Sequence, residues 1–220
     1  MATFLLIHGG SGSGWDWHLV VEELLWRGHE AVAPDLPIGN PEAKLADFAA
    51  TATAAVEGKP DIVVVGHSYG GFTAPLAAAR LENARLLVFL AGMVPAPGEA
   101  PGQWWGNVGF EGPGSGLTET ETYLGDVPPE LAAEALSRSR DQLSAEWDDP
   151  WPDARLPDIP TRVLLCRDDK FFSPELQRRV ARERLGFEAD AIDEIDGSHG
   201  VALSRPVELA ERLERYFATL

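Results

Sequence analysis

The chain has 220 residues, of which 45% are hydrophobic and 24% are charged, a composition typical of soluble globular proteins. Its 35 acidic and 18 basic residues give a formal net charge of −17, which repels nucleic-acid phosphates and anionic membrane surfaces. We therefore expect no nucleic-acid partner and no membrane partner.

The beginning of the chain and its cysteine content favour a cytoplasmic location. The apolar run at residues 3–7 is too short for a secretory signal, and no basic segment precedes it. No apolar run reaches the roughly 20 residues that a transmembrane helix needs. The single Cys166 excludes an internal disulfide, and we expect it to be a buried core residue of the apolar run at residues 162–166.

Short apolar runs alternate with helical patterns along the chain. This alternation predicts an α/β fold, with a mostly parallel sheet of about six strands flanked by helices. Most of the runs are continuously apolar, as expected where both faces of a sheet are buried. Acidic residues interrupt the last run, which favours an edge strand. The predicted strands are residues 3–7, 31–33, 62–65, 86–90, 162–166 and 189–195.

Helical spacing of apolar residues predicts three helices between these strands and a fourth after the last of them. Gly28 is a plausible cap after the first helix, and Ser173 with Pro174 is typical of the start of the third. The predicted helices are residues 17–27, 41–56, 174–185 and 206–217.

Residues 94–160 break this rhythm, since they are rich in Pro, Gly and Trp and contain one clear helical stretch, residues 129–143. A structureless loop of this length is improbable in a compact domain. We therefore predict an inserted cap between two parts of the core domain, residues 1–93 and 161–220. The aromatic candidates for lining a substrate pocket under this cap are Trp104, Trp105 and Trp147, and packing within the cap is the alternative.

The segment from Gly66 to Gly70 matches the pattern G-x-S-x-G between a predicted strand and a helical segment. A sharp turn from strand to helix strains the serine backbone and presents its hydroxyl above the sheet. The residues two before and two after the serine crowd together, and glycine relieves this crowding. The amides at the start of the following helix favour negative charge there. We predict that Ser68 is a nucleophile.

A serine nucleophile needs a base, and among the five histidines only His199 lies late in the chain, between the last strand and the last helix. The order serine, acid, histidine is typical of a nucleophile on such a turn. His67 directly precedes the serine, and its side chain is expected to point away from the hydroxyl. The acid is expected after the strand at residues 162–166, where Asp169 is preferred and Asp168 is the alternative.

The glycine-rich loop after the first strand completes the candidate site. One of its backbone N–H groups, that of Gly10, and the N–H of Tyr69 are predicted to form an oxyanion hole. Nucleotide binding is disfavoured, because Trp15 stands where a G-x-G-x-x-G motif requires its third glycine and no G-K-[ST] follows.

With these motifs the chain resembles the α/β-hydrolase superfamily over essentially its whole length. It is similar to the group that contains EstC-like esterases, plant methylesterases and plant hydroxynitrile lyases. This resemblance implies an α/β-hydrolase fold with a small cap and no metal or organic cofactor. It rests on Phe4-Leu5-Leu6-Ile7-His8-Gly9-Gly10, Trp15-Asp16-Trp17, the Gly-His-Ser-x-Gly-Gly turn, Asp169, Phe172-Ser173-Pro174-Glu175 and Gly197-Ser198-His199.

Together these features predict a cofactor-independent serine esterase that cleaves a small carboxylic ester through an acyl-enzyme. Hydroxynitrile lyases of the group carry a threonine and a lysine where this chain has Gly9 and Gly200, which disfavours cyanide release. The alternatives are lactone or thioester hydrolysis, lyase-type C–C cleavage on the same triad, and a non-catalytic receptor for a small ligand.

Overall fold

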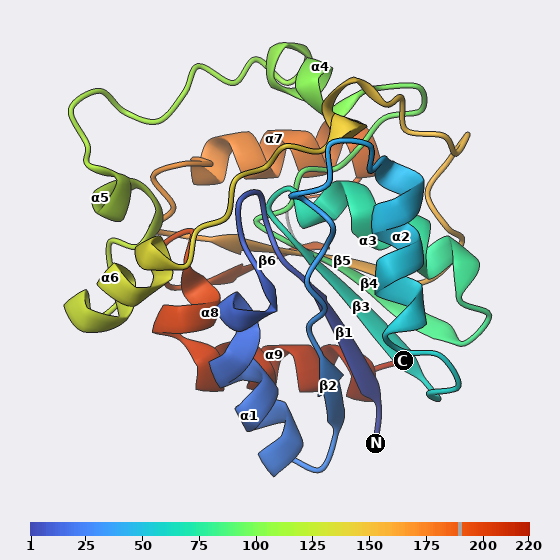
Figure 1. Ribbon diagram of the computed structural model, residues 1–220. Coiled ribbons are helices and arrows are strands. Elements are labelled where there is room, and N and C mark those ends of the chain that lie inside the picture. Colours follow the sequence, from blue (N-terminus) through green and yellow to red (C-terminus); the bar gives the residue numbers. More distant parts are fainter. Residues whose placement is uncertain (189–190) are drawn as a thin grey trace.

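The computed structural model describes residues 1–188 and 191–220. Within these residues one six-stranded sheet has the order β2-β1-β3-β4-β5-β6, and neighbouring strands all pair in parallel (Figure 1). The predicted α/β fold and the edge position of the last strand are therefore confirmed. The strands are β1 (Thr3–Ile7), β2 (Glu30–Val32), β3 (Ile62–His67), β4 (Ala84–Leu90), β5 (Thr161–Cys166) and β6 (Ile192–Ile195).

The last predicted strand is longer than the one observed. Residues 189–195 were expected to be extended, whereas β6 begins at Ile192. Residues 189 and 190 of that prediction lie outside the described residues.

Helices cover both faces of the sheet, which explains the continuously apolar strands. In β1, Phe4 and Leu6 belong to the core under one helical layer, and Leu5 and Ile7 to the core under the other. Both sets of side chains are therefore buried. The first layer contains α1 (His18–Trp26), α8 (Val201–Ser204) and α9 (Pro206–Ala218), and the second contains α2 (Leu45–Ala54), α3 (Gly70–Arg80) and α7 (Pro174–Leu185).

Local capping sets the limits of α7 as predicted. The Ser173 hydroxyl accepts a hydrogen bond from the Leu176 N–H (3.2 Å), and Pro174 occupies the first turn. Gly186 ends the helix in the left-handed region, at φ 68°. The helix predicted at residues 17–27 is observed as α1, one residue shorter at each end, and Trp17 instead ends a short 3-10 helix η1 (Gly14–Trp17).

The helices of the segment at residues 94–160 lie over the carboxyl ends of the strands in Figure 1, whereas its residues 152–159 lie beside the end of α3 and the start of β4. The helix predicted at residues 129–143 ends at Ser137 instead. Leu124 and Val127 of this segment pack against Leu203 of α8. The limits of a separate cap stay a prediction. The helices of the segment are α4 (Pro101–Asn107), α5 (Glu119–Tyr123), α6 (Pro129–Ser137) and the 3-10 helix η2 (Ala145–Asp148).

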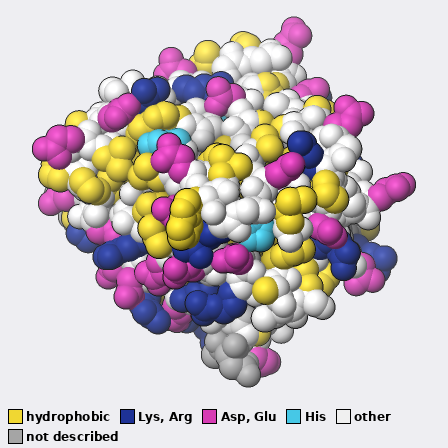
Figure 2. Space-filling model, turned by 90° about the horizontal axis from the view of Figure 1, so that it is seen from below, with side chains coloured by type: hydrophobic (Ala, Val, Ile, Leu, Met, Phe, Trp, Pro, Cys, Tyr) yellow, Lys and Arg dark blue, Asp and Glu magenta, His cyan; other side chains and the backbone are white. Residues whose placement is uncertain are grey.

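Acidic and basic side chains are interspersed on the face that Figure 2 shows. Arg27, for example, pairs with Glu211 and Glu214, and Lys59 pairs with Glu30. In the described ranges, every helix is too short or too polar to span a bilayer.

Two imidazoles, those of the buried His8 and the half-buried His67, join loops at the carboxyl ends of the strands. His8 donates from Nδ1 to the Gly9 carbonyl (2.8 Å) and accepts from the Leu36 N–H at Nε2 (3.0 Å). His67 donates from Nε2 to the His199 carbonyl (2.9 Å). Burial lowers the pKa of His8 to about 4 and the pKa of His67 to about 3.

These lowered pKa values predict loss of stability in mild acid. Between about pH 4 and pH 6.5 the unfolded chain binds a proton on each of these histidines, whereas the folded chain does not. The free energy of unfolding therefore falls as pH is lowered, by about 1.4 kcal/mol per pH unit for each buried imidazole. Urea denaturation between pH 6 and pH 4.5 should show a shallower pH slope in His8→Gln than in the wild type. An unchanged slope contradicts the assignment of a neutral buried His8.

Candidate active site

The turn between β3 and α3 places Ser68 in a strained conformation, at φ 51°. Backbone hydrogen bonds hold it there, since the Ser68 N–H donates to the Leu90 carbonyl (3.1 Å) and the Met93 N–H donates to the Ser68 carbonyl (2.9 Å). The predicted crowding is observed on both sides of the serine. A Cβ atom on Gly66 would lie 2.7 Å from the Gly70 carbonyl oxygen, and one on Gly70 would lie 2.7 Å from a carbonyl oxygen of β1. Both positions therefore require glycine.

The loops after β5 and β6 bring Asp169 and His199 together. Asp169 Oδ2 accepts from Nδ1–H of His199 at 2.7 Å, and both side chains are buried. Asp169 Oδ1 accepts from the backbone N–H groups of Phe171 and Phe172, both at 2.8 Å. These bonds fix the carboxylate. Because Nδ1 of His199 donates to it, Nε2 is the ring nitrogen that remains available as an acceptor.

Asp168 has a different role. Its exposed carboxylate accepts from the Gly197 N–H (3.1 Å), and its own N–H donates to the Gly197 carbonyl (3.0 Å). The structure therefore brings Asp169, and not Asp168, to the imidazole of His199.

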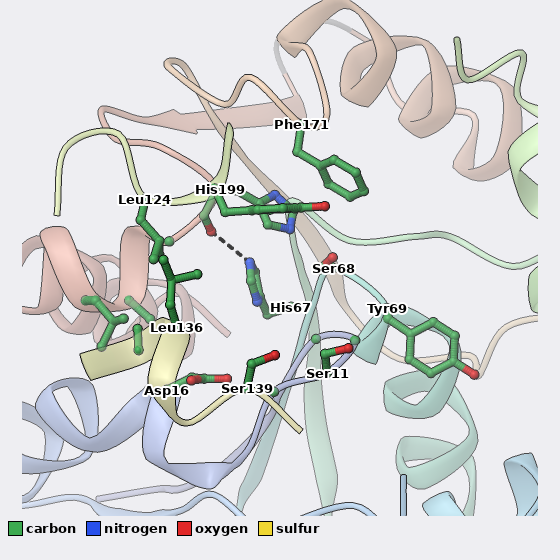
Figure 3. A pocket seen from close by; sticks show the side chains of 18 of the residues that line it. Ser11, Asp16, His67, Ser68, Tyr69, Leu124, Leu136, Ser139, Phe171 and His199 are labelled. Carbon is green, nitrogen blue, oxygen red and sulfur yellow. Dashed lines mark hydrogen bonds between the residues drawn. The ribbon is translucent and has the colours of Figure 1, made fainter. Parts of the chain in front are cut away.

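Ser68 and His199 line the same cavity, and Figure 3 shows the Ser68 hydroxyl below the His199 ring. In the described part of the chain no hydrogen bond joins the Ser68 hydroxyl to His199. The His67 ring also lines this cavity, with its centroid 4.7 Å from that of His199. The motif alone did not indicate that His67 would bind the carbonyl of the residue predicted as the base.

Gly10 and Tyr69 both lie in the cavity wall beside Ser68. A Cβ atom on Gly9 would be 3.1 Å from Ser68 Cβ, so the loop after β1 passes directly against the serine. Neither the Gly10 N–H nor the Tyr69 N–H donates a hydrogen bond within residues 1–188 and 191–220. Two backbone donors are thus free beside the serine, close to the N-terminus of α3.

The cavity has a volume of about 490 Å³ and contains two of the three tryptophans predicted for it, Trp105 and Trp147. The prediction that Trp104 lines the pocket is wrong. Its side chain is only 2% exposed, and its Nε1–H donates to the Val94 carbonyl (3.0 Å), so it packs in the core and not along the cavity. Phe171 and Tyr123 supply further aromatic wall, with ring centroids 4.7 Å apart.

Polar residues that the motifs did not single out as site residues also line the cavity, among them Asp16 and Gln142. Burial raises the pKa of Asp16, whose Oδ2 accepts from the Ser13 N–H (3.0 Å). Cys166 is buried, and burial raises the pKa of its thiol well above its usual range. No group of three or more His, Cys, Asp and Glu side chains in the described residues is arranged to hold a metal ion.

Comparisons with known proteins agree with this geometry. The chain is 33% identical to the probable esterase PIR7A of Oryza sativa subsp. indica over 110 residues, which cover 45% of this chain and 42% of that protein. The match thus spans less than half the length of this relative. The chain is also 27% identical to the probable hydrolase R7 of Phoma sp., with 94% of both chains covered.

Among solved structures, polyneuridine aldehyde esterase superposes with a TM-score of 0.80 at 20% identity, over 98% of this chain and 99% of that chain. This likeness confirms the predicted α/β-hydrolase fold. Residues 4–212 match the family model described as "Alpha/beta hydrolase family". Since that match covers almost the whole sequence, the chain belongs to the α/β-hydrolase family.

Proposed function

We propose that this protein is a serine esterase that hydrolyses a small carboxylic ester through an acyl-enzyme intermediate. One observation carries the proposal: His199, whose ring is bound by the buried Asp169, shares a cavity with Ser68 and with two free backbone donors. This set supplies the nucleophile, the base, the group that orients the base, and the donors for an oxyanion.

In the first half of the reaction, Nε2 of His199 takes the proton of the Ser68 hydroxyl as the oxygen attacks the ester carbonyl. The N–H groups of Gly10 and Tyr69 stabilise the resulting oxyanion. Asp169 keeps the proton on Nδ1 and stabilises the imidazolium. When the tetrahedral intermediate collapses, the C–O bond to the alcohol breaks and His199 protonates the leaving oxygen.

In the second half, a water molecule gives a proton to Nε2 of His199 and attacks the acyl carbonyl. The same two N–H groups stabilise the second oxyanion. Its collapse releases the carboxylic acid and returns the proton to Ser68. All steps use this chain's own residues and water.

The cavity supports a small, mainly apolar ester. A volume of about 490 Å³ is in the usual range for small-molecule sites, and aromatic side chains of Trp105, Trp147 and Phe171 line it. The esterase names of PIR7A and of polyneuridine aldehyde esterase support the same reaction class.

The surroundings of Gly200 favour ester hydrolysis over lyase-type cleavage. A Cβ atom there would lie 2.6 Å from Leu124 Cδ2 and 3.1 Å from the Tyr123 carbonyl oxygen. A lysine, which lyases of the resembling group carry at this place, therefore requires the Leu124 side chain and the Tyr123 carbonyl to shift.

The first test is hydrolysis of short-chain p-nitrophenyl esters by the wild type and by Ser68→Ala. We expect kcat of the variant to fall on the order of 10⁶-fold, which is background in this assay, because the nucleophile is lost. Ser137→Ala, at the exposed end of α6, serves as the control and should match the wild type. Full activity in Ser68→Ala contradicts the mechanism. Tight ligand binding by a wild type that turns over no ester supports a receptor instead.

The second test separates the two neighbouring aspartates. Asp169→Asn retains the side-chain shape but removes the charge that fixes the His199 tautomer, so kcat should fall by about 10⁴-fold. Asp168→Asn, which alters an exposed turn, should stay within about threefold of the wild type. Steady-state kinetics on the same esters measures both. A larger loss in Asp168→Asn than in Asp169→Asn reverses the assignment.

A further inference from the structure

The backbone of Ser11 is held by the segment that precedes η2. The Ser11 N–H donates to Oε1 of Gln142 (2.9 Å), and the Ser11 carbonyl accepts from the Arg140 N–H (2.8 Å). Ser11 adopts φ 55°, a left-handed conformation that is uncommon for a residue with a side chain. Contacts from another part of the chain therefore stabilise the loop that carries the Gly10 N–H.

The amide of Gln142 bridges this loop to a buried carboxylate. Its Nε2 donates to Oε1 of Glu146 at 2.6 Å, and Glu146 has no exposed surface. A donor on one side and an acceptor on the other allow only one orientation of the amide. Oε1 of Gln142 therefore faces the loop, and it would lie 3.2 Å from a Cβ atom on Gly10.

The same carboxylate lies near the other half of the candidate oxyanion hole. Burial and then the negative charge of Glu146 raise the pKa of Tyr69 well above its usual range. The Tyr69 ring also contacts the ring of Trp147, with centroids 5.0 Å apart. η2 thus lies against the side chain of Tyr69, while Gln142 just before it holds the residue that follows Gly10.

The position of Glu146 is costly for stability. Its Oε2 has no hydrogen-bond partner in the described residues, and a buried carboxylate without full pairing is unfavourable. An apolar side chain of similar size avoids this cost but leaves Nε2 of Gln142 without its acceptor. Glu146 thus serves two polar neighbours, the Gln142 amide that it orients and the Tyr69 hydroxyl whose pKa it raises.

We propose that Gln142, oriented by Glu146, is a positioning residue that aims the Gly10 N–H at the oxyanion. The inference rests on the proposed esterase function. It assigns to the segment over the sheet a part in transition-state stabilisation, in addition to its part in the cavity wall. Because the oxyanion forms only during reaction, the contribution of Gln142 lies in kcat and not in substrate binding.

Gln142→Met tests the inference, since methionine has a similar length but neither hydrogen bond. Removal of one oxyanion donor costs about 10²–10³ in turnover, and displacement costs less, so we expect kcat to fall by about 10- to 100-fold. KM on p-nitrophenyl butyrate should stay within about twofold. The matched control is Gln103→Met, which removes an exposed glutamine of α4 whose Oε1 accepts from the N–H of Ala100, the residue before that helix (3.0 Å). Both constants should be unchanged in the control.

Gln142→Glu gives a second readout that a purely structural role does not produce. The new carboxylate faces Glu146 at the present hydrogen-bond distance, so the pair takes up a shared proton as pH falls. The protonated pair restores a donor toward Glu146 and an acceptor toward Ser11. The kcat of this variant, relative to that of the wild type at the same pH, should therefore rise between pH 8 and pH 5.5. This pH dependence of kcat tests the positioning role of Gln142 even if Gln142→Met does not fold.

The outcomes separate the two proposals. A wild type that hydrolyses no ester and resists a serine-directed phosphonate contradicts the esterase function, and the positioning role with it. An active wild type with an unchanged kcat in Gln142→Met contradicts the positioning role alone. A flat kcat ratio across pH in Gln142→Glu, or equal losses in Gln142→Met and Gln103→Met, also contradicts it.

Discussion

The close packing of backbone around Ser68 is the constraint on which the site depends. Gly66 and Gly70 let β3 turn into α3 without a side-chain collision, and Gly9 lets the loop after β1 pass against the serine. The strained backbone of Ser68 persists because hydrogen bonds from the region after β4 hold it. A hydroxyl, a helix N-terminus and a loop with a free N–H therefore meet at one point, at the carboxyl edge of a parallel sheet.

Neutral imidazoles hold the loops around this point. His8 joins the loop after β1 to Leu36, and His67 joins the serine turn to the carbonyl of His199. Each ring uses one nitrogen as a donor, which a neutral imidazole supports without a counter-ion in the core. A charged side chain at position 8 or 67 would need a partner of opposite charge beside it. Of the two histidines that line the cavity, His67 and His199, it is His199 that has a carboxylate partner, since its Nδ1–H binds Asp169.

The parts of the structure that follow from local pattern could be predicted. The apolar strands, the capped α7, and the glycines around Ser68 are set by residues close together in sequence. His199 could be chosen as a candidate from chain order, which also narrowed the acid to Asp168 or Asp169, because parallel strands bring their carboxyl ends to one edge. The short helices α4, α5 and η2 have little helical periodicity, and packing against the core determines them.

The position of Trp104 was predicted wrongly because the sequence does not reveal which face of α4 is buried. The contact of Gln142 with Ser11 joins residues 131 positions apart, and no local signal marks it.

The support of Asp169 has a consequence for how this site can diversify. The carboxylate is fixed by the main-chain N–H groups of residues 171 and 172, and the side chain of Phe171 forms part of the cavity wall. Any residue except proline at position 171 retains the N–H on which the carboxylate depends. Under the proposed esterase function, position 171 can therefore accumulate substitutions while the orientation of Asp169 is inherited unchanged, so new substrate specificities are accessible by single mutations in the cavity wall.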